Sequence, residues 1–232
     1  MWVIISAIIF FVLLYTVVPY FLSRGLGVKV FKRGRDLSKV AFTFDDGPNP
    51  IYTPILLDLL KENNVKATFF VVGTKVEKYP ELIQRMHNEG HLLGIHNYLH
   101  HSNWFMSPWR VRKGLDDTAK VIEAITGVTP IYYRPPWGML NLFDFVRKGT
   151  YKIILWSIMA EDWRTSGGSE KIKHRLAKIK GGDVILLHDC GDTFGAEMDA
   201  PRNTINALKD VLKTVKTKGF TCVRVDELLE KL

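Results

Sequence analysis

The sequence predicts an α/β barrel preceded by one apolar N-terminal helix. Short apolar runs alternate with amphipathic segments along most of the 232 residues, which is typical of repeated βα units. The apolar runs are almost continuous, as expected for parallel strands buried on both faces. Polar side chains follow several of these runs directly, and functional groups at the carboxyl ends of several strands are typical of a barrel. A doubly wound sheet, the alternative, would gather them at one crevice.

The first predicted element is a helix over residues 1–22, which contain no charged side chain and are rich in Ile, Val, Leu and Phe. A helix of that length spans roughly 33 Å, enough to cross a bilayer. Because no small-residue cleavage motif follows, we expect an uncleaved transmembrane anchor rather than a removed signal peptide. A buried core helix is the alternative. A basic linker is predicted over residues 23–38 and the α/β domain over residues 39–232.

Two arguments from the sequence predict opposite orientations of this anchor in the membrane. Five basic residues follow the apolar segment and none precedes it: Arg24, Lys29, Lys32, Arg33 and Arg35. The positive-inside rule therefore places the domain in the cytoplasm. The substrate inferred below favours the extracytoplasmic side of a bacterial membrane.

The remaining elements alternate in order. Seven segments are predicted as strands: Val40–Phe44, Ala67–Val72, His91–Ile95, Thr129–Tyr133, Tyr151–Trp156, Asp183–His188 and Phe220–Val223. Seven are predicted as helices: Pro54–Asn63, Pro80–Glu89, Val111–Thr126, Asn141–Lys148, Ser169–Ile179, Pro201–Lys218 and Asp226–Leu232.

The composition of the chain limits the classes of binding partner that we expect. The formal net charge is +8, which favours an anionic surface as neighbour. The basic residues are scattered and no nucleic-acid-binding motif is present, so we expect no nucleic acid partner. Cys190 and Cys222 are expected to be small buried hydrophobes, with a disulfide outside the cell as the alternative. His87 and His91 flank the end of a predicted helix and are expected to be structural or surface residues.

The stretch "VAFTFDDGPNP" places Asp45 and Asp46 side by side after a predicted strand. Neighbouring side chains of an extended chain point to opposite faces, so the two carboxylates are expected to differ in role. One would bind a cation and the other would handle a proton. An ordinary turn after the strand is the alternative, because Asp, Gly, Pro and Asn all favour turns.

A second stretch, "GIHNYLHHSNW", contains His96 and His100 four residues apart. On a helix such a pair faces one way and can bind one metal. His101 offers a competing register. Two histidines and one carboxylate with open positions make a common hydrolytic metal site, and Asp46 supplies the carboxylate.

Five ordered motifs together resemble those of NodB-type polysaccharide deacetylases, the carbohydrate esterase family 4. The resemblance extends from about Val40 to the C-terminus. The motifs are "TFDDGP" (43–48), "HNYLH" (96–100), "RPPWG" (134–138), "EDW" (161–163) and "ILLH" (185–188). The family's fold is a distorted (β/α)7 barrel, the NodB homology domain, which agrees with the prediction from the strand pattern.

The resemblance implies a metal site and a base. Asp46, His96 and His100 would hold a divalent metal, with zinc as first choice and cobalt, nickel or manganese as alternatives. Asp45 would be the general base that takes a proton from metal-bound water, and Arg134 would orient it.

The resemblance also implies an acid and a substrate pocket. His188 would be the general acid that protonates the departing amine. The backbone N–H of Trp137 would stabilise the oxyanion, and Trp163 and Leu186 would shape the pocket for the acetyl methyl group.

Two positions depart from the family pattern. Asn97 replaces a Ser or Thr after the first histidine and retains the ability to tie the loop. Met159 falls where the family's D-x-x-D-W motif begins with Asp, a carboxylate expected to hold the acid histidine. We therefore expect a His188 that loses its proton more easily than in relatives, unless Asp189 or Glu161 substitutes.

The resulting prediction is a metal-dependent N-deacetylase acting on N-acetylhexosamine units of a cell-wall or chitin-like polysaccharide. One alternative is a membrane-tethered, non-catalytic or weakly active glycan-binding homologue, and another is a hydrolase of a different small amide. Aromatic residues near the second and third motifs are expected either to stack on sugar rings or to pack beneath loops: Trp104, Phe105, Trp109 and Trp137.

Overall fold

A curled, all-parallel sheet forms the centre of the protein, and the computed structural model describes residues 1–146 and 151–229. The strands are β1 (Val30–Phe31), β2 (Lys39–Asp45), β3 (Thr68–Val71), β4 (Leu92–Ile95), β5 (Tyr132–Tyr133), β6 (Lys152–Ile154), β7 (Ile158–Met159), β8 (Val184–His188) and β9 (Thr221–Cys222). Their order in the sheet is β1-β6-β5-β4-β3-β2-β8-β7, and β9 pairs with the start of β2.

The barrel is distorted because its two edges are not paired by strands in the described part of the chain. β6 and β7 lie near opposite edges of the sheet order, yet only residues 155–157 connect them. The chain itself therefore spans the gap. This arrangement confirms the predicted distorted barrel, as opposed to a doubly wound sheet.

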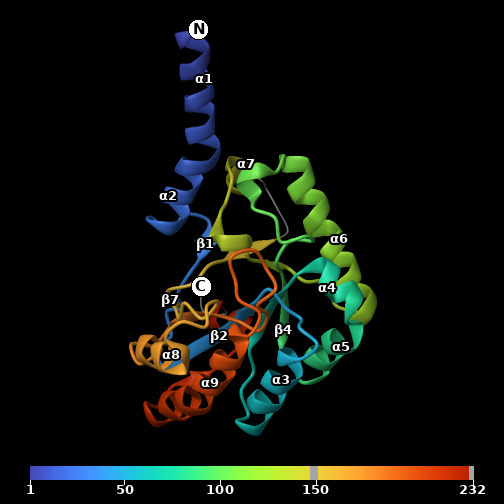
Figure 1. The fold of residues 1–232 in the computed structure, drawn as a ribbon, viewed down its shortest axis with the longest axis vertical. Helices are drawn as coiled ribbons and strands as arrows, with labels where there is room; N and C mark the ends of the chain where they lie inside the picture. Colours follow the sequence, from blue (N-terminus) through green and yellow to red (C-terminus); the bar gives the residue numbers. More distant parts are fainter. Residues whose placement is uncertain (147–150, 230–232) are drawn as a thin grey trace.

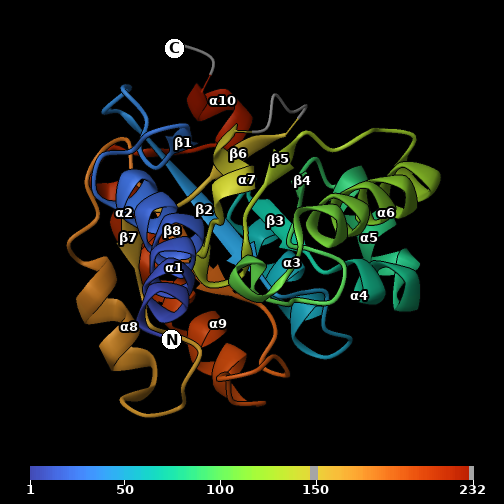
Figure 2. The ribbon, with the colours of Figure 1, turned by 90° about the horizontal axis from the view of Figure 1, so that it is seen from above.

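Helices cover the outside of the sheet (Figures 1 and 2). They are α3 (Tyr52–Glu62), α4 (Gly73–Lys78), α5 (Pro80–Asn88), α6 (Pro108–Thr126), α7 (Leu142–Val146), α8 (Gly168–Leu176), α9 (Ala200–Thr217) and α10 (Val225–Leu229). Two single 3-10 turns, Asn103–Phe105 and Pro136–Gly138, lie in the loops. Ser107 caps α6 by accepting a hydrogen bond from the Arg110 amide, with Pro108 in the first turn.

The hydrophobic core lies between the sheet and these helices. Phe42, Phe44 and Phe69 are completely buried, and the rings of Phe44 and Phe69 stack across β2 and β3 with centroids 5.2 Å apart. α9 adds an apolar face that includes Leu208. Because both faces of the central strands are covered, their sequences are almost uniformly apolar until the polar residues at their carboxyl ends.

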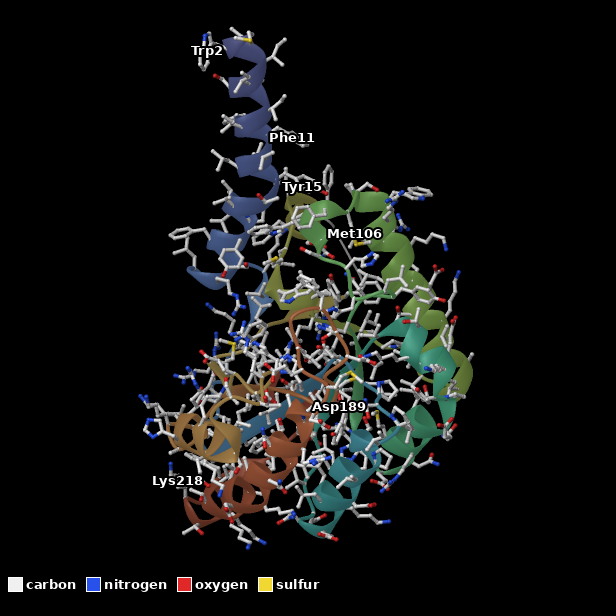
Figure 3. All side chains as sticks on the ribbon, viewed as in Figure 1. Trp2, Phe11, Tyr15, Met106, Asp189 and Lys218 are labelled. Atoms are coloured by element: carbon white, nitrogen blue, oxygen red, sulfur yellow. The ribbon has the colours of Figure 1, made fainter. Side chains whose placement is uncertain are left out.

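The N-terminal helix projects from the domain (Figure 1). It runs through α1 (Trp2–Val12), a π-helical turn (Leu13–Val17) and α2 (Val18–Arg24). Figure 3 shows Trp2 well clear of the domain and Tyr15 close to Met106. The Tyr15 hydroxyl donates to the Met106 carbonyl at 2.6 Å. The outer turns are therefore exposed, whereas the last turns pack on the domain.

The structure adds elements that the sequence pattern did not predict: β1, β7 and α4. β1 lies inside the predicted linker and pairs with β6, so part of residues 23–38 belongs to the folded unit. Residues 147–148 and 230–232, predicted to extend two helices, lie outside the described residues. Cys190 and Cys222 are free thiols, Cys190 buried and Cys222 partly buried.

Candidate active site

The carboxyl ends of neighbouring strands bring the candidate residues to one cavity. In the pairing of β2 with β8, Asp45 stands opposite His188. His96 directly follows β4, and Arg134 directly follows β5. The cavity has a volume of about 550 Å³, and Asp45, His96 and His188 are among its lining residues.

Asp46, His96 and His100 converge on one point. Their candidate ligand atoms lie within 4.8 Å of one another. Asp46 Oδ1 is 3.2 Å from His96 Nε2 and 3.0 Å from His100 Nε2. Burial opposes the charge on Asp46, but hydrogen bonds with His100 and His96 hold the pKa of its carboxyl well below the usual range.

A loop, not a helix, presents the two histidines, so the helical interpretation of their spacing is wrong. Asn97 and His100 adopt positive φ angles of 60° and 54°. Asn97 Nδ2 donates to the His101 carbonyl and to Asn103 Oδ1, both at 2.9 Å. Asn97 thus ties the loop, as expected for its position.

The donor set fits a divalent cation. His96 Nδ1 lies 2.7 Å from the Arg134 carbonyl oxygen, which can only accept, so Nδ1 carries the proton. Nε2 is then the nitrogen that faces the Asp46 carboxylate, and it is the atom available to a cation, which binds the neutral ring. Burial also lowers the pKa of His100, although Asp46 opposes this effect. Two imidazole lone pairs and a carboxylate facing one another are stabilised by a cation between them.

Asp45 lies beside this cluster in the same cavity, and its orientation is fixed by Arg134. Arg134 is completely buried, and its Nη1 donates to Asp45 Oδ1 and Thr43 Oγ1, both at 2.7 Å. Asp45 Oδ2 lies 3.8 Å from His96 Nε2. The positive φ of 75° at Asp46 turns the chain immediately after β2. The adjacent carboxylates therefore reach the same cavity, although an extended chain would separate them.

His188 is held by Asp162. His188 Nδ1 lies 2.8 Å from Asp162 Oδ1, and the His188 amide donates to Oδ2 at 2.9 Å. Thr204 Oγ1 donates to the same oxygen at 2.8 Å. Burial lowers the pKa of His188, but the Asp162 carboxylate outweighs that effect and, with smaller contributions from Asp46 and Asp45, raises it to about 9.

The carboxylate that Met159 does not supply to His188 comes from Asp162, rather than from Asp189 or Glu161. Met159 pairs with Leu186 in the sheet, two residues before His188, whereas Asp162 lies three residues further along and reaches the imidazole. The carboxylate of the retained "DW" dipeptide holds the histidine, and Glu161 instead forms an ion pair with Arg175. His188 therefore keeps its proton more strongly than a free histidine, and the comparison with relatives stays a prediction.

The three predicted substrate-binding residues line the same cavity. Trp137 has a φ of 55° within a 3-10 turn, whose first amides have no partner inside the turn. The Trp163 ring meets His188 edge-on with centroids 5.8 Å apart, and Leu186 lies between the sheet and the cavity. A groove of about 930 Å³ adjoins this cavity and shares His100 and Trp137 with it.

Several residues at the site were missed by sequence reasoning. Thr193 Oγ1 donates to Asp46 Oδ2, and Tyr20 and Arg24 of the N-terminal helix line the cavity. Asp189, which the sequence offered as a partner for His188, instead accepts a hydrogen bond from Thr53 Oγ1. It is buried, which raises its pKa to about 7, and it packs where a Cβ on Gly47 would stand. Asp162 belongs to the "EDW" motif that the sequence analysis identified, but its contact with His188 was not predicted.

The four aromatic residues of the predicted cluster are separated in the structure, and Trp109 is exposed at a different hollow, beside Phe143. Trp104 packs edge-on against Tyr20 with centroids 5.7 Å apart and donates its indole N–H to the Leu140 carbonyl. Phe105 is exposed and lines the large groove, and Trp137 lines both hollows. Packing therefore accounts for Trp104, whereas Phe105 and Trp137 present their rings to the groove.

Comparisons with known proteins identify relatives across most of the chain. A family profile described as Polysaccharide deacetylase matches residues 32–142. A peptidoglycan-N-acetylglucosamine deacetylase of Bacillus cereus is 36% identical over 196 residues, covering 82% of this chain and 87% of the relative. The peptidoglycan-N-acetylmuramic acid deacetylase PdaC of Bacillus subtilis is 34% identical over 192 residues, covering 82% of this chain and 38% of the relative.

A solved structure of a peptidoglycan deacetylase has a similar fold. The Bc1960 peptidoglycan N-acetylglucosamine deacetylase, in complex with 4-naphthalen-1-yl-N-oxidanyl-benzamide, superimposes with a TM-score of 0.80 at 30% sequence identity. The match covers 89% of this chain and 95% of that structure.

Proposed function

Because the chain belongs to the polysaccharide deacetylase family, we propose that it hydrolyses the N-acetyl group of N-acetylhexosamine units in a bacterial cell-wall glycan. The observation that carries this proposal is the convergence of Asp45, Asp46, His96, His100 and His188 on one cavity. An amide is a weak electrophile with a poor leaving group, so its hydrolysis needs a base, an acid and oxyanion stabilisation at one point.

Asp46, His96 and His100 would hold a divalent cation, with zinc first among several that suit this ligand set. When bound, such an ion supplies a Lewis acid that polarises the acetyl carbonyl and lowers the pKa of water. The residues around it fix the ligands: the Arg134 carbonyl orients His96, and Thr193 donates to Asp46. Ligands held in this way lose little freedom when they bind an ion.

Asp45 would accept the proton of the attacking water. Its Oδ1 is engaged by Arg134, which leaves Oδ2 as the free basic atom on the side of His96. Arg134 cannot rotate away, because its Nε and Nη2 also donate to the Ile154 and Leu155 carbonyls. The base is therefore aimed by four hydrogen bonds of one buried guanidinium.

His188 would deliver a proton to the departing nitrogen. Asp162 occupies Nδ1, so Nε2 is the proton-bearing atom available to the substrate. The raised pKa of about 9 keeps the ring protonated at neutral pH, as a general acid requires. The Trp137 amide would donate to the oxyanion, and Leu186 and Trp163 would enclose the acetyl methyl group.

The groove supports a polymeric substrate. It continues from the catalytic cavity past His100 and Trp137 toward Phe105, so a glycan could occupy both hollows while one acetamido group reaches the base. Exposed aromatic rings along such a groove suit the apolar faces of sugars.

The test is acetate release from peptidoglycan and from N-acetylchitooligosaccharides by the full chain in detergent. Activity is expected to vanish after chelation, return with zinc or cobalt, and fall at least about 100-fold in Asp45→Asn, because one proton-transfer group contributes roughly that factor. A folded, metal-bound protein that releases no acetate from any of these glycans would overturn the proposal. Such a protein would instead be a glycan-binding homologue or a hydrolase of another amide.

We also propose that the N-terminal helix anchors the enzyme. Trp2–Arg24 is long and apolar enough to cross a membrane, with a mean hydropathy of 2.5, a property shared by signal sequences. The contacts of Tyr15 and Tyr20 with the domain favour retention of the helix, because cleavage would remove them. Residues 1–22 would form the anchor and residues 39–232 the extracytoplasmic catalytic domain.

The anchor and its orientation can be tested in cells. An intact chain that remains in membranes after alkaline carbonate, with its domain open to external protease, is expected. Recovery of a shortened soluble chain would identify a signal peptide, and protection from protease would support the orientation that the positive-inside rule predicts.

A further inference from the structure

The N-terminal helix contributes a charged side chain to the catalytic cavity. Arg24, the last residue of α2, lines that cavity together with Asp45, His96 and His188. Tyr20, one turn earlier on the helix, lines it as well. The N-terminal helix projects away from the domain at its start (Figure 1), and its last turn supplies two of the residues that line the cavity.

Packing fixes the Arg24 guanidinium in place. Its Cζ lies 3.8 Å from the centroid of the Trp156 ring, at stacking distance. Its Nη2 contacts Gly138, where a Cβ would stand 2.8 Å away. Since Gly138 directly follows Trp137, Arg24 lies beside the turn that carries the proposed oxyanion donor.

The charge of Arg24 is not compensated. Within residues 1–146 and 151–229 the structure shows no ion pair between Arg24 and a carboxylate, and its buried Nε has no hydrogen-bond partner. By contrast, Arg134, which is completely buried behind the cavity, is paired with Asp45. Arg24 is partly buried and has lost part of its hydration without gaining a carboxylate partner, so a group that supplies the missing negative charge would bind with a gain.

We propose that Arg24 binds a carboxylate of the substrate, so that the preferred substrate is an N-acetylhexosamine whose ring carries an acidic substituent beside the acetamido group. This inference rests on the proposed function for its substrate. A planar guanidinium stacked on an aromatic ring is preorganised for bidentate carboxylate binding. Its position next to Trp137 and Gly138 sets the carboxylate close to the reacting acetyl group, as for substituents on adjacent ring carbons.

The experiment compares two substrates that differ only in charge. N-acetylmuramic acid disaccharide and its lactyl methylamide are given to the full chain, loaded with zinc in detergent, as wild type, Arg24→Ala, Arg24→Lys and Arg202→Ala. Arg202 is an exposed arginine on α9 and serves as the matched control. For the wild type we expect kcat/KM at least about 10-fold higher on the acid than on the amide, because a charged hydrogen bond contributes about that factor.

The variants should separate charge from packing. Arg24→Ala is expected to bring the acid-to-amide ratio near one, mainly through KM, with a smaller common loss on both substrates from the missing contact with Trp156. Arg24→Lys should retain part of the preference, and Arg202→Ala all of it. A ratio near one in the wild type, or an unchanged ratio in Arg24→Ala, would overturn the inference.

A binding measurement separates this inference from the proposed function. Calorimetric titration of the Asp45→Asn protein with both disaccharides reports carboxylate recognition without turnover. If no variant releases acetate but the acid binds at least about 10-fold tighter than the amide only when Arg24 is present, the deacetylase proposal fails and the Arg24 inference stands. If acetate is released but acid and amide bind equally, the deacetylase proposal stands and the Arg24 inference fails.

Discussion

Replacing Asp162 by Asn should move the alkaline limit of activity to lower pH. The neutral amide keeps a hydrogen-bonding side chain beside His188 but removes the carboxylate that raises the imidazole pKa to about 9. Without that charge, burial lowers the pKa and only the smaller contributions of Asp46 and Asp45 raise it, so the pKa should fall to its ordinary value of about 6.5 or below. The sign follows from the role of His188: activity requires its protonated form, so activity is lost as the pH rises through the pKa.

The magnitude follows from the protonated fraction. At pH 7.5 a group with a pKa of about 9 is roughly 97% protonated, whereas one with a pKa of about 6.5 is roughly 9% protonated. Asp162→Asn should therefore lower kcat/KM about 10-fold at pH 7.5 and much less below pH 6. A cation held by Asp46 offsets that residue's own smaller contribution to the His188 pKa, but the contribution of Asp162 remains.

The assay is acetate release by the full chain between pH 5 and pH 10, for wild type, Asp162→Asn and Glu161→Gln. Glu161 is the matched control because its carboxylate is paired with Arg175, away from His188. Its profile should superimpose on that of the wild type. If Asp162→Asn kept the wild-type alkaline limit, the assignment of His188 as an acid tuned by Asp162 would be wrong.

Two further predictions concern stability, measured by urea unfolding in detergent. Gly47→Ala should lower the free energy of unfolding by about 1–3 kcal/mol through overpacking, because the new Cβ would lie 2.3 Å from Asp189 Oδ2. Gly114→Ala is the control, because its Cβ meets only ordinary contacts at 3.6 Å. Equal stability of the two variants would contradict the packing argument. His91 Nδ1 accepts a hydrogen bond from the Ala67 amide. Burial lowers the pKa of His91 to about 4. Between pH 6.5 and pH 4 the unfolded chain therefore binds a proton at His91 that the folded protein does not. The free energy of unfolding should fall by up to about 3 kcal/mol as the pH drops from 6.5 through 4. His91→Asn should remove this contribution to the pH dependence of stability. An unchanged pH dependence in the variant would exclude His91 as its source.

Local sequence was sufficient for much of the fold and for the ligand types at the site. The apolar runs located most strands because both of their faces are covered, and "TFDDGP" marked the end of β2 where Asp45 and Asp46 stand. Short elements such as β1 and β7 were missed, because two-residue strands have no periodicity and form only through their partners.

Two local inferences failed because backbone conformation and strand register are tertiary properties. The spacing of His96 and His100 suggested a helix, yet both lie in a loop whose positive φ at His100 depends on surrounding contacts. The position of Met159 in the motif suggested a missing carboxylate for the acid histidine. The register of β7 against β8 instead brings Asp162, 26 residues away in sequence, to His188.

By itself the sequence determined that this protein is an apolar helix followed by an α/β barrel with paired aspartates, histidines and an arginine at the strand ends. Only the tertiary structure decided that Asp162 holds His188, and that Arg24 of the helix reaches the catalytic cavity. The physical reason is the same in both cases. The residue type sets the charge and length of a side chain, but contacts between segments far apart in the chain determine which charged groups lie next to it.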